Sequence, residues 1–177
     1  MGEGLYYKHS GRVPIGGPAI TIAGGAIVGS ILALIYAYFD AASPFIYLNL
    51  IGAIAVGAIP AIVTGMLAVR TRLRNATIVT LAGAIVGFIA LYVAWAAWPN
   101  AILGEKIGTD VRFAHLLASQ VALGRTIGWI NRNGAWRIGS TVETGFILWL
   151  AWAGEAAIII GMPLFLAPTF IKGRVFC

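Results

Sequence analysis

The residue best placed to do chemistry in this sequence is Glu155, an acid inside an apolar run at residues 144–167. A helix rises about 1.5 Å per residue, so Glu155 would lie roughly 16 Å from the start of that run, near the middle of a bilayer. A carboxylate at that depth is unfavourable unless it is protonated, paired or hydrated. No lysine or arginine lies inside another apolar run, so the candidate hydrogen-bond partners are hydroxyl groups, chiefly those of Tyr36 and Tyr92.

Two interpretations of Glu155 are open at this point. In the functional one, the side chain binds a cation or relays a proton, which are the usual roles of an acid inside a membrane. In the structural one, it is a neutral acid that ties two helices together through hydrogen bonds. The sequence does not decide between them.

Two pairs of glycines four residues apart form the clearest packing motif. Gly25 and Gly29 lie in the first apolar run, and Gly83 and Gly87 lie in the third. Glycines at this spacing leave a groove along a helix in which a second backbone can approach closely. We therefore predict that these four glycines pack against neighbouring helices.

Familiar catalytic and cofactor motifs are missing from the sequence. It has no serine–histidine–aspartate order, phosphate-binding loop, dinucleotide glycine fingerprint or zinc-protease helix. Its one cysteine, Cys177, allows neither an internal disulfide nor a metal site made from cysteines of this chain alone. We predict no catalytic residues, no metal and no cofactor, and expect a protein that is not an enzyme. A membrane enzyme assembled from isolated residues stays open as an alternative.

Long apolar helices must position these residues. Of the 177 residues, 60% are hydrophobic and 10% are charged, a balance that water cannot solvate in a folded chain. Four runs reach the roughly 20 residues that span a bilayer; they cover residues 18–39, 45–69, 76–98 and 144–167. The predicted fold class is all-α, a polytopic membrane bundle of four transmembrane helices with an interfacial helix in the third connection.

The connections set the boundaries of these elements. Residues 70–75 carry three arginines and make a tight hairpin, and Pro99 is expected to end the third span. In the following segment, Thr109 and Asp110 can cap a helix that runs to about Gly124 and places Phe113, Leu116, Leu117 and Val121 on one side. Residues 131–134 (NRNG) resemble a turn.

Basic residues in short connections predict the orientation. They place an N-terminal segment (residues 1–17), the arginine hairpin and a tail (residues 168–177) in the cytoplasm. Transmembrane helices 1–3 occupy residues 18–98, and the fourth occupies residues 144–167, which leaves residues 99–143 as an extracytoplasmic interfacial segment. The N-terminal segment has no hydrophobic signal region, so we expect the first apolar run to stay in the membrane.

Several phrases carry a resemblance to known sequences. They are residues 6–14 (YYKHSGRVP), 46–49 (IYLN), 74–75 (RN), 133–136 (NGAW) and 148–152 (LWLAW), together with Glu155. The chain resembles a group of uncharacterised bacterial four-span inner-membrane proteins with no assigned activity, so the resemblance implies a multi-pass protein of the inner (plasma) membrane and no specific reaction. Members of that group continue past a Phe-Cys pair into a cysteine-bearing tail. Cys177 would begin that tail, or would have no role.

Two functions compete on this evidence. The leading hypothesis is an accessory or self-assembling subunit of a membrane complex that acts through helix packing, with the lipid bilayer and other subunits or further copies of the chain as partners. The alternative is a small ion channel or proton-coupled transporter with Glu155 in its pathway. The formal charge of +6 does not indicate nucleic acid, because no basic and aromatic platform accompanies it.

Overall fold

The computed structural model describes residues 11, 13–43, 46–103, 112–134, 136–138 and 141–172. Within them, the chain forms α1 (Gly17–Ala42), α2 (Ile46–Arg70), α3 (Ala76–Leu103), α4 (Phe113–Ala118), α5 (Gln120–Asn133), β1 (Trp136–Ile138), β2 (Thr141–Glu143), α6 (Gly145–Leu166) and α7 (Thr169–Lys172).

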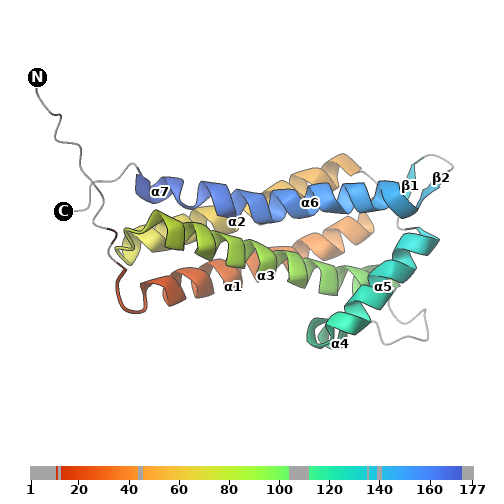
Figure 1. Ribbon diagram of the computed structural model, residues 1–177. Helices are drawn as coiled ribbons and strands as arrows, with labels where there is room; N and C mark the ends of the chain where they lie inside the picture. The colour runs from red at the N-terminus through yellow and green to blue at the C-terminus, as the bar shows by residue number, and fades with distance from the viewer. Residues whose placement is uncertain are drawn as a thin grey trace, which may run out of the picture.

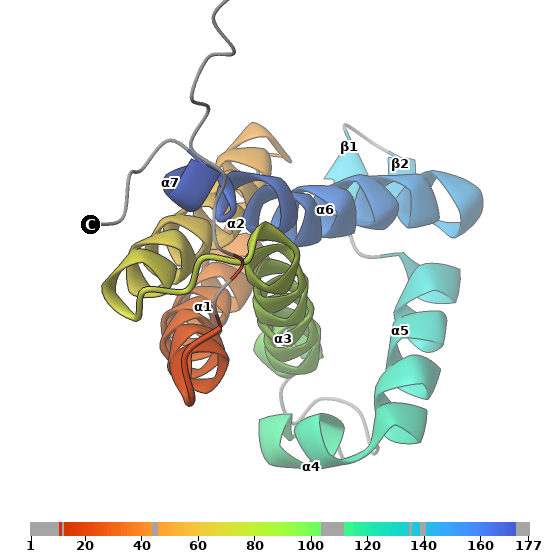
Figure 2. The same ribbon diagram turned by 60° about the vertical axis from the view of Figure 1, so that its left-hand side comes forward.

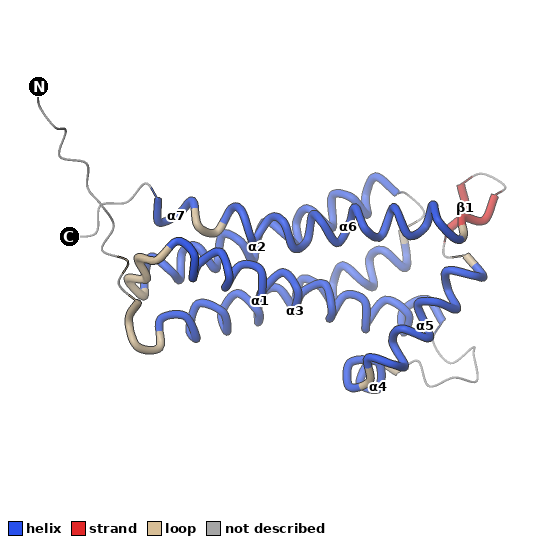
Figure 3. The backbone as a smooth tube through the Cα atoms, in the orientation of Figure 1, coloured by secondary structure: helices blue, strands red, loops and turns tan. Residues whose placement is uncertain are grey.

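Four of these helices are long and apolar enough to cross a membrane. The spans are Gly17–Ala42, Tyr47–Arg70, Ala76–Leu103 and Gly145–Lys172, with mean hydropathy between 1.8 and 2.2. Few polar side chains interrupt them, so lipid rather than water can solvate their outer faces. The chain is therefore a multi-pass membrane protein built as a helical bundle, and the predicted fold class is confirmed (Figures 1 and 3).

The four long helices form a ring in which α1 and α6 are diagonally opposite. Each of these two packs against both α2 and α3, and the second diagonal, between α2 and α3, makes a smaller contact. The start of α1, the α2–α3 connection and α7 lie at one end of the bundle (Figure 1). At the other end, α4 and α5 extend from α3 and return to the start of α6 (Figure 2).

The glycine pair of α1 faces α2 and α3. A Cβ atom added at Gly29 would lie 3.3 Å from the Cβ of Ala90 on α3 and 3.5 Å from the Cγ of Pro60 on α2. One added at Gly25 would collide with Thr64 of α2 and approach Val86 of α3. These two glycines therefore let α1 settle into the groove between its two neighbours.

The glycine pair of α3 faces the backbone of α6. A Cβ at Gly87 would lie 2.8 Å from the Cα of Ile160 and 3.0 Å from the carbonyl oxygen of Ile159. One at Gly83 would overlap the carbonyl group of Pro163. All four glycines are thus used in packing between helices of this one chain.

The prediction that Pro99 ends the third span is wrong. Helix α3 continues through this residue to Leu103, and Pro99 is buried inside it. Proline removes one backbone N–H donor but does not by itself unwind the turn that follows. That turn is held from outside, because the Tyr38 hydroxyl of α1 donates a hydrogen bond of 3.0 Å to the Asn100 side-chain oxygen.

The third connection is helical for longer than predicted. Thr109 and Asp110 lie outside the described residues, and the helix that follows is interrupted at Ser119, whose hydroxyl accepts a hydrogen bond from the backbone N–H of Ala122. Helix α5 then continues past Gly124 to Asn133, so most of the stretch predicted as a turn is helical and only Gly134 has a positive φ, of 89°. Because the helix restarts at Ser119, Val121 is 64% exposed rather than packed with Leu116.

Helix α5 is amphipathic and closes one side of this end of the bundle. It buries Leu123, Ile127 and Ile130 in a cluster that also contains Trp152 of α6. The Asn131 side chain donates a 2.9 Å hydrogen bond to the Gly145 carbonyl at the start of α6. Between α5 and α6, β1 and β2 form a short antiparallel hairpin, with residues 136–138 paired to residues 143–141, where we predicted no strands.

Candidate functional site

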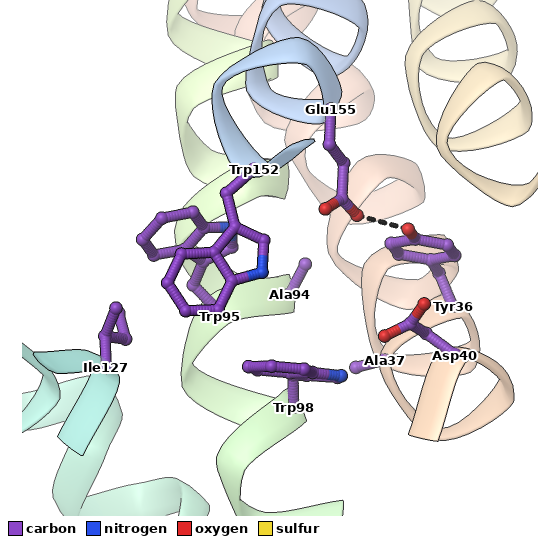
Figure 4. Close-up of a pocket in the computed structure, with 9 residues that line it drawn as sticks. All are labelled: Tyr36, Ala37, Asp40, Ala94, Trp95, Trp98, Ile127, Trp152 and Glu155. Carbon is purple, nitrogen blue, oxygen red and sulfur yellow. Dashed lines mark hydrogen bonds between the residues drawn. The ribbon is translucent and has the colours of Figure 1, made fainter. Parts of the chain in front are cut away.

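A polar cluster lies between the two diagonal helices α1 and α6. Glu155 is near the middle of α6, while Tyr36 and Asp40 are four residues apart on α1 and therefore share one face of that helix. The side chains of Tyr36 and Glu155 point toward each other, with Asp40 one turn further along α1 (Figure 4). We call these three residues the acidic cluster.

A hydrogen bond joins the two helices through this cluster. The Tyr36 hydroxyl donates to the Glu155 carboxylate oxygen Oε1. Tyr36 is only 6% exposed, and the bond reaches across the bundle between helices that otherwise pack mainly on α2 and α3. Of the two candidate partners of Glu155, Tyr36 is therefore the one that bonds to it.

Tyr92 has a different role. Its hydroxyl donates a 2.9 Å hydrogen bond to the backbone carbonyl of Leu117. That bond ties the outer part of α3 to α4, so Tyr92 positions the third connection rather than Glu155.

Asp40 joins the site although the first apolar run was predicted to end one residue before it, at residue 39. Helix α1 extends to Ala42, and the backbone N–H of Ser43 caps it by bonding to the carbonyl of Phe39 at 2.9 Å. Asp40 therefore lies within the helix. Its spacing of four residues from Tyr36 is the signal that could have revealed this.

A small cavity separates the acidic cluster from a wall of tryptophans. It holds about 20 Å³ and is lined by the acidic cluster together with Trp95, Trp98 and Trp152 (Figure 4). This is room for about one water molecule. The buried indole N–H of Trp98 is turned toward the Asp40 carboxylate (Figure 4).

The tryptophan wall is held rigid by contacts between its rings. Trp152 of α6 meets Trp95 and Trp98 of α3 edge to face, with ring centroids 5.7 and 5.8 Å apart. Trp149 adds a third such contact at 5.2 Å. Aromatic pairs prefer this geometry, and each contributes about 0.5–1.5 kcal/mol beyond the area that it buries. The wall therefore fixes α3 and α6 on this side of the acidic cluster.

A larger cavity lies on the opposite side of the cluster, among α1, α2 and α6. It has a volume of about 350 Å³. Besides the acidic cluster it is lined by Tyr47 and Asn49 of α2 and by apolar side chains, among them Leu50, Leu150 and Ile158. Tyr36, Asp40 and Glu155 line both cavities and so form the boundary between them.

The chemistry of this arrangement is that of proton and cation binding. Among the described residues, no lysine or arginine lies close enough to Asp40 or Glu155 to stabilise its carboxylate by charge. In the same part of the chain, no three histidine, cysteine, aspartate or glutamate side chains come together to hold a metal ion. The groups available are two carboxyls, two phenol hydroxyls, an amide and an indole N–H.

Comparisons with known protein families, curated proteins and solved structures find no match for this chain. The resemblance to four-span inner-membrane proteins therefore stays a hypothesis, and the function is argued from the site alone.

Proposed function

We propose that this chain is a small proton-coupled transporter with Glu155 at the centre of its pathway. The observation that supports it most is the position of the acidic cluster, which lines two cavities at once. A carboxyl group in that position can exchange a proton with water on one side and contact a solute on the other. Acidic side chains inside membrane helices commonly serve as such relays.

Coupling follows from the two states of one carboxyl group. With a proton bound, Glu155 is neutral and has little attraction for a cation. Without the proton it is an anion in surroundings of low dielectric, where an opposite charge is strongly attracted. Proton and cation then compete for the same oxygens, and this competition is the elementary requirement for exchanging one against the other.

Close packing in the other half of the bundle favours a transporter over an open channel. Between the acidic cluster and the α7 end, Gly29 of α1 meets Ala90 and Pro60, and Ala33 is fully buried. A solute passing the cluster would therefore need helices to move. Prolines inside α2 and α6, Pro60 and Pro163, each remove a backbone hydrogen bond and provide places where these helices can bend.

A purely structural role for Glu155 predicts different behaviour of two variants. Glu155→Gln keeps an oxygen that can accept the Tyr36 hydroxyl but abolishes the exchange of a proton, whereas Tyr36→Phe removes the bond and keeps the carboxyl group. If Glu155 only ties α1 to α6, Tyr36→Phe is the damaging change and Glu155→Gln is mild. If Glu155 carries protons, Glu155→Gln stops transport in a protein that remains folded.

Reconstituted vesicles test the proposal directly. Vesicles with a pH gradient and an internal pH-sensitive dye are given Na⁺, K⁺ or an organic ammonium salt, and protein-free vesicles provide the passive rate. We expect at least one cation to speed the internal pH change in the parent protein, no such effect for Glu155→Gln, and parental rates for Glu143→Gln, an acid outside the cluster. Passive rates for the parent with every cation would contradict the proposal.

The hypothesis of an accessory or self-assembling subunit rests on glycine-rich helix faces, few polar residues inside the spans and the missing catalytic motifs. Of these features, the faces at Gly25, Gly29, Gly83 and Gly87 already pack against helices of the same chain. Association with other subunits or with further copies stays a prediction. Mass measurement in mild detergent would test it.

We further propose the inner (plasma) membrane of a bacterium as the location, with both termini cytoplasmic. The basic α2–α3 connection, with Arg70, Arg72 and Arg74, lies at the same end of the bundle as the start of α1 and α7 (Figure 1). Asp40 is near the opposite end. The positive-inside rule then places the arginine end in the cytoplasm and both cavities toward the outer face.

A further inference from the structure

The large cavity has the features of a binding site for an organic molecule rather than for a bare ion. Its volume of about 350 Å³ is within the range of small-molecule pockets. Much of its wall is apolar, contributed by Leu50 and Ala53 of α2 and by Leu150 and Ile158 of α6. An apolar wall of this size favours a ligand that has an apolar body of its own.

One end of this cavity offers several oxygen acceptors. Asp40 and Glu155 supply carboxylate oxygens, and Asn49 on α2 lines the cavity beside them. Asn49 is 8% exposed, and its side-chain oxygen has no hydrogen-bond partner among the described residues. A buried acceptor without a partner is unfavourable, and a ligand donor that turned this side chain toward the cavity would satisfy it.

A primary ammonium group matches these acceptors. It carries a positive charge and three N–H donors, and hydrogen bonds between charged partners are stronger than neutral ones. Tyr36 already donates its hydroxyl to Glu155, so it holds that carboxylate in place. The ammonium group would supply the positive charge that no lysine or arginine of the described residues brings to the acidic cluster.

The mouth of the cavity indicates where such a ligand enters. Tyr47, near the start of α2, is 78% exposed, and Leu150 of α6 is 57% exposed. Both line the cavity and both belong to membrane-spanning helices. The opening between α2 and α6 therefore faces lipid close to one membrane surface, where amphipathic molecules accumulate.

We propose that the large cavity binds a primary ammonium compound with an apolar group, which enters sideways from the bilayer, with its charge at Asp40, Glu155 and Asn49. This assignment rests on the proposed function, because it names the cation that would compete with the proton at Glu155. It also makes a claim about binding that needs no transport to be tested.

Equilibrium binding of 2-phenylethylammonium is the test. Titration calorimetry uses the full chain in lipid nanodiscs, with empty nanodiscs as the blank, and 2-phenylethanol as the neutral analogue of the same shape. We expect saturable binding of the ammonium compound and binding of the alcohol that is weaker by about tenfold or more, since the lost hydrogen bonds involve charged groups. Equal affinity for the two would overturn the proposal.

Glycine variants of α6 locate the site without touching the acids. Gly154 lines the cavity, and a Cβ added there would have no atom within 4 Å, so Gly154→Phe places a ring in open space beside Glu155. Gly161, seven residues later on the same helix, meets only the ring of Phe165 at 4.0 Å and serves as the matched control. We expect Gly154→Phe to weaken binding about tenfold or more and Gly161→Phe to leave it unchanged.

The two experiments separate the binding site from the transport function. Parental affinity in Gly154→Phe, or loss of affinity in both glycine variants, would place the ligand elsewhere and refute the assignment. Vesicles that exchange protons for Na⁺ or K⁺, with no saturable binding of the ammonium compound, would refute it as well and leave the proposed function standing. Saturable, Gly154-sensitive binding without proton exchange would support the site and contradict transport.

Discussion

Replacing Gly87 with alanine should separate α3 from α6, and Gly154→Ala provides the reference. Both glycines lie inside long helices, so each substitution gains about 0.5–1 kcal/mol from the lower backbone entropy of alanine. At Gly87 the new Cβ lies 2.8 Å from the Cα of Ile160 and 3.0 Å from the carbonyl oxygen of Ile159, both backbone atoms that cannot rotate away. Overpacking of this kind costs about 1–3 kcal/mol.

The net effect should differ in sign between the two sites. Gly154→Ala meets nothing within 4 Å and should stabilise the protein by the helix contribution alone, about 0.5–1 kcal/mol. Gly87→Ala should be less stable than Gly154→Ala by about 1–3 kcal/mol, the cost of overpacking. Reversible unfolding of both variants and the parent in mixed detergent micelles measures these differences. Equal stability of the two variants would show that α3 and α6 do not approach at Gly87.

Three further outcomes follow from named contacts. Tyr36→Phe should lower the free energy of unfolding in the same micelles by about 0.6–1.7 kcal/mol, which are the average and the maximum measured for hydrogen bonds between membrane helices. No change would mean that the bond to Glu155 is not formed. Tyr92→Phe should leave unfolding of the four long helices nearly unchanged but speed proteolysis of the third connection, because the bond to Leu117 is lost. Cleavage at the parental rate would mean that this bond does not hold the third connection in place. In a Cys177→Ser background, single cysteines at positions 72 and 132 should react with membrane-impermeant reagents from opposite sides of the membrane, with position 72 cytoplasmic. Labelling of both positions from one side would overturn the topology.

The four spans could be predicted from sequence because their signal is local. A run of about 20 apolar residues has few stable alternatives to a membrane helix, so the spans were found to within a few residues at most ends. Glu155 was found for the same reason, since one acid in such a run has few ordinary explanations. The exception at Pro99 depended on a distant contact, the hydrogen bond between Tyr38 and Asn100.

The rest of the site could not be predicted, because it depends on how the helices are rotated about their axes. Helices that are apolar on all sides give no pattern that says which face points inward. Tyr36 and Tyr92 were therefore equal candidates for Glu155 until the bundle placed α1 across from α6. Asp40 was misplaced because a charge with a proline four residues later usually marks the end of a helix, whereas α1 continues for two residues beyond Asp40.

The diagonal position of α1 and α6 also bears on how the chain is assembled during synthesis. The last span has the lowest mean hydropathy of the four, 1.8, and carries an acid at its centre. A charged side chain at that position costs about 2.5–3.5 kcal/mol when a helix inserts into the membrane alone. Its hydrogen-bond donor, Tyr36, belongs to the first span and is already in the bilayer when α6 leaves the ribosome. The first helix therefore supplies the donor that the acid of the last helix needs, and this bond can form only when both helices are in the bilayer.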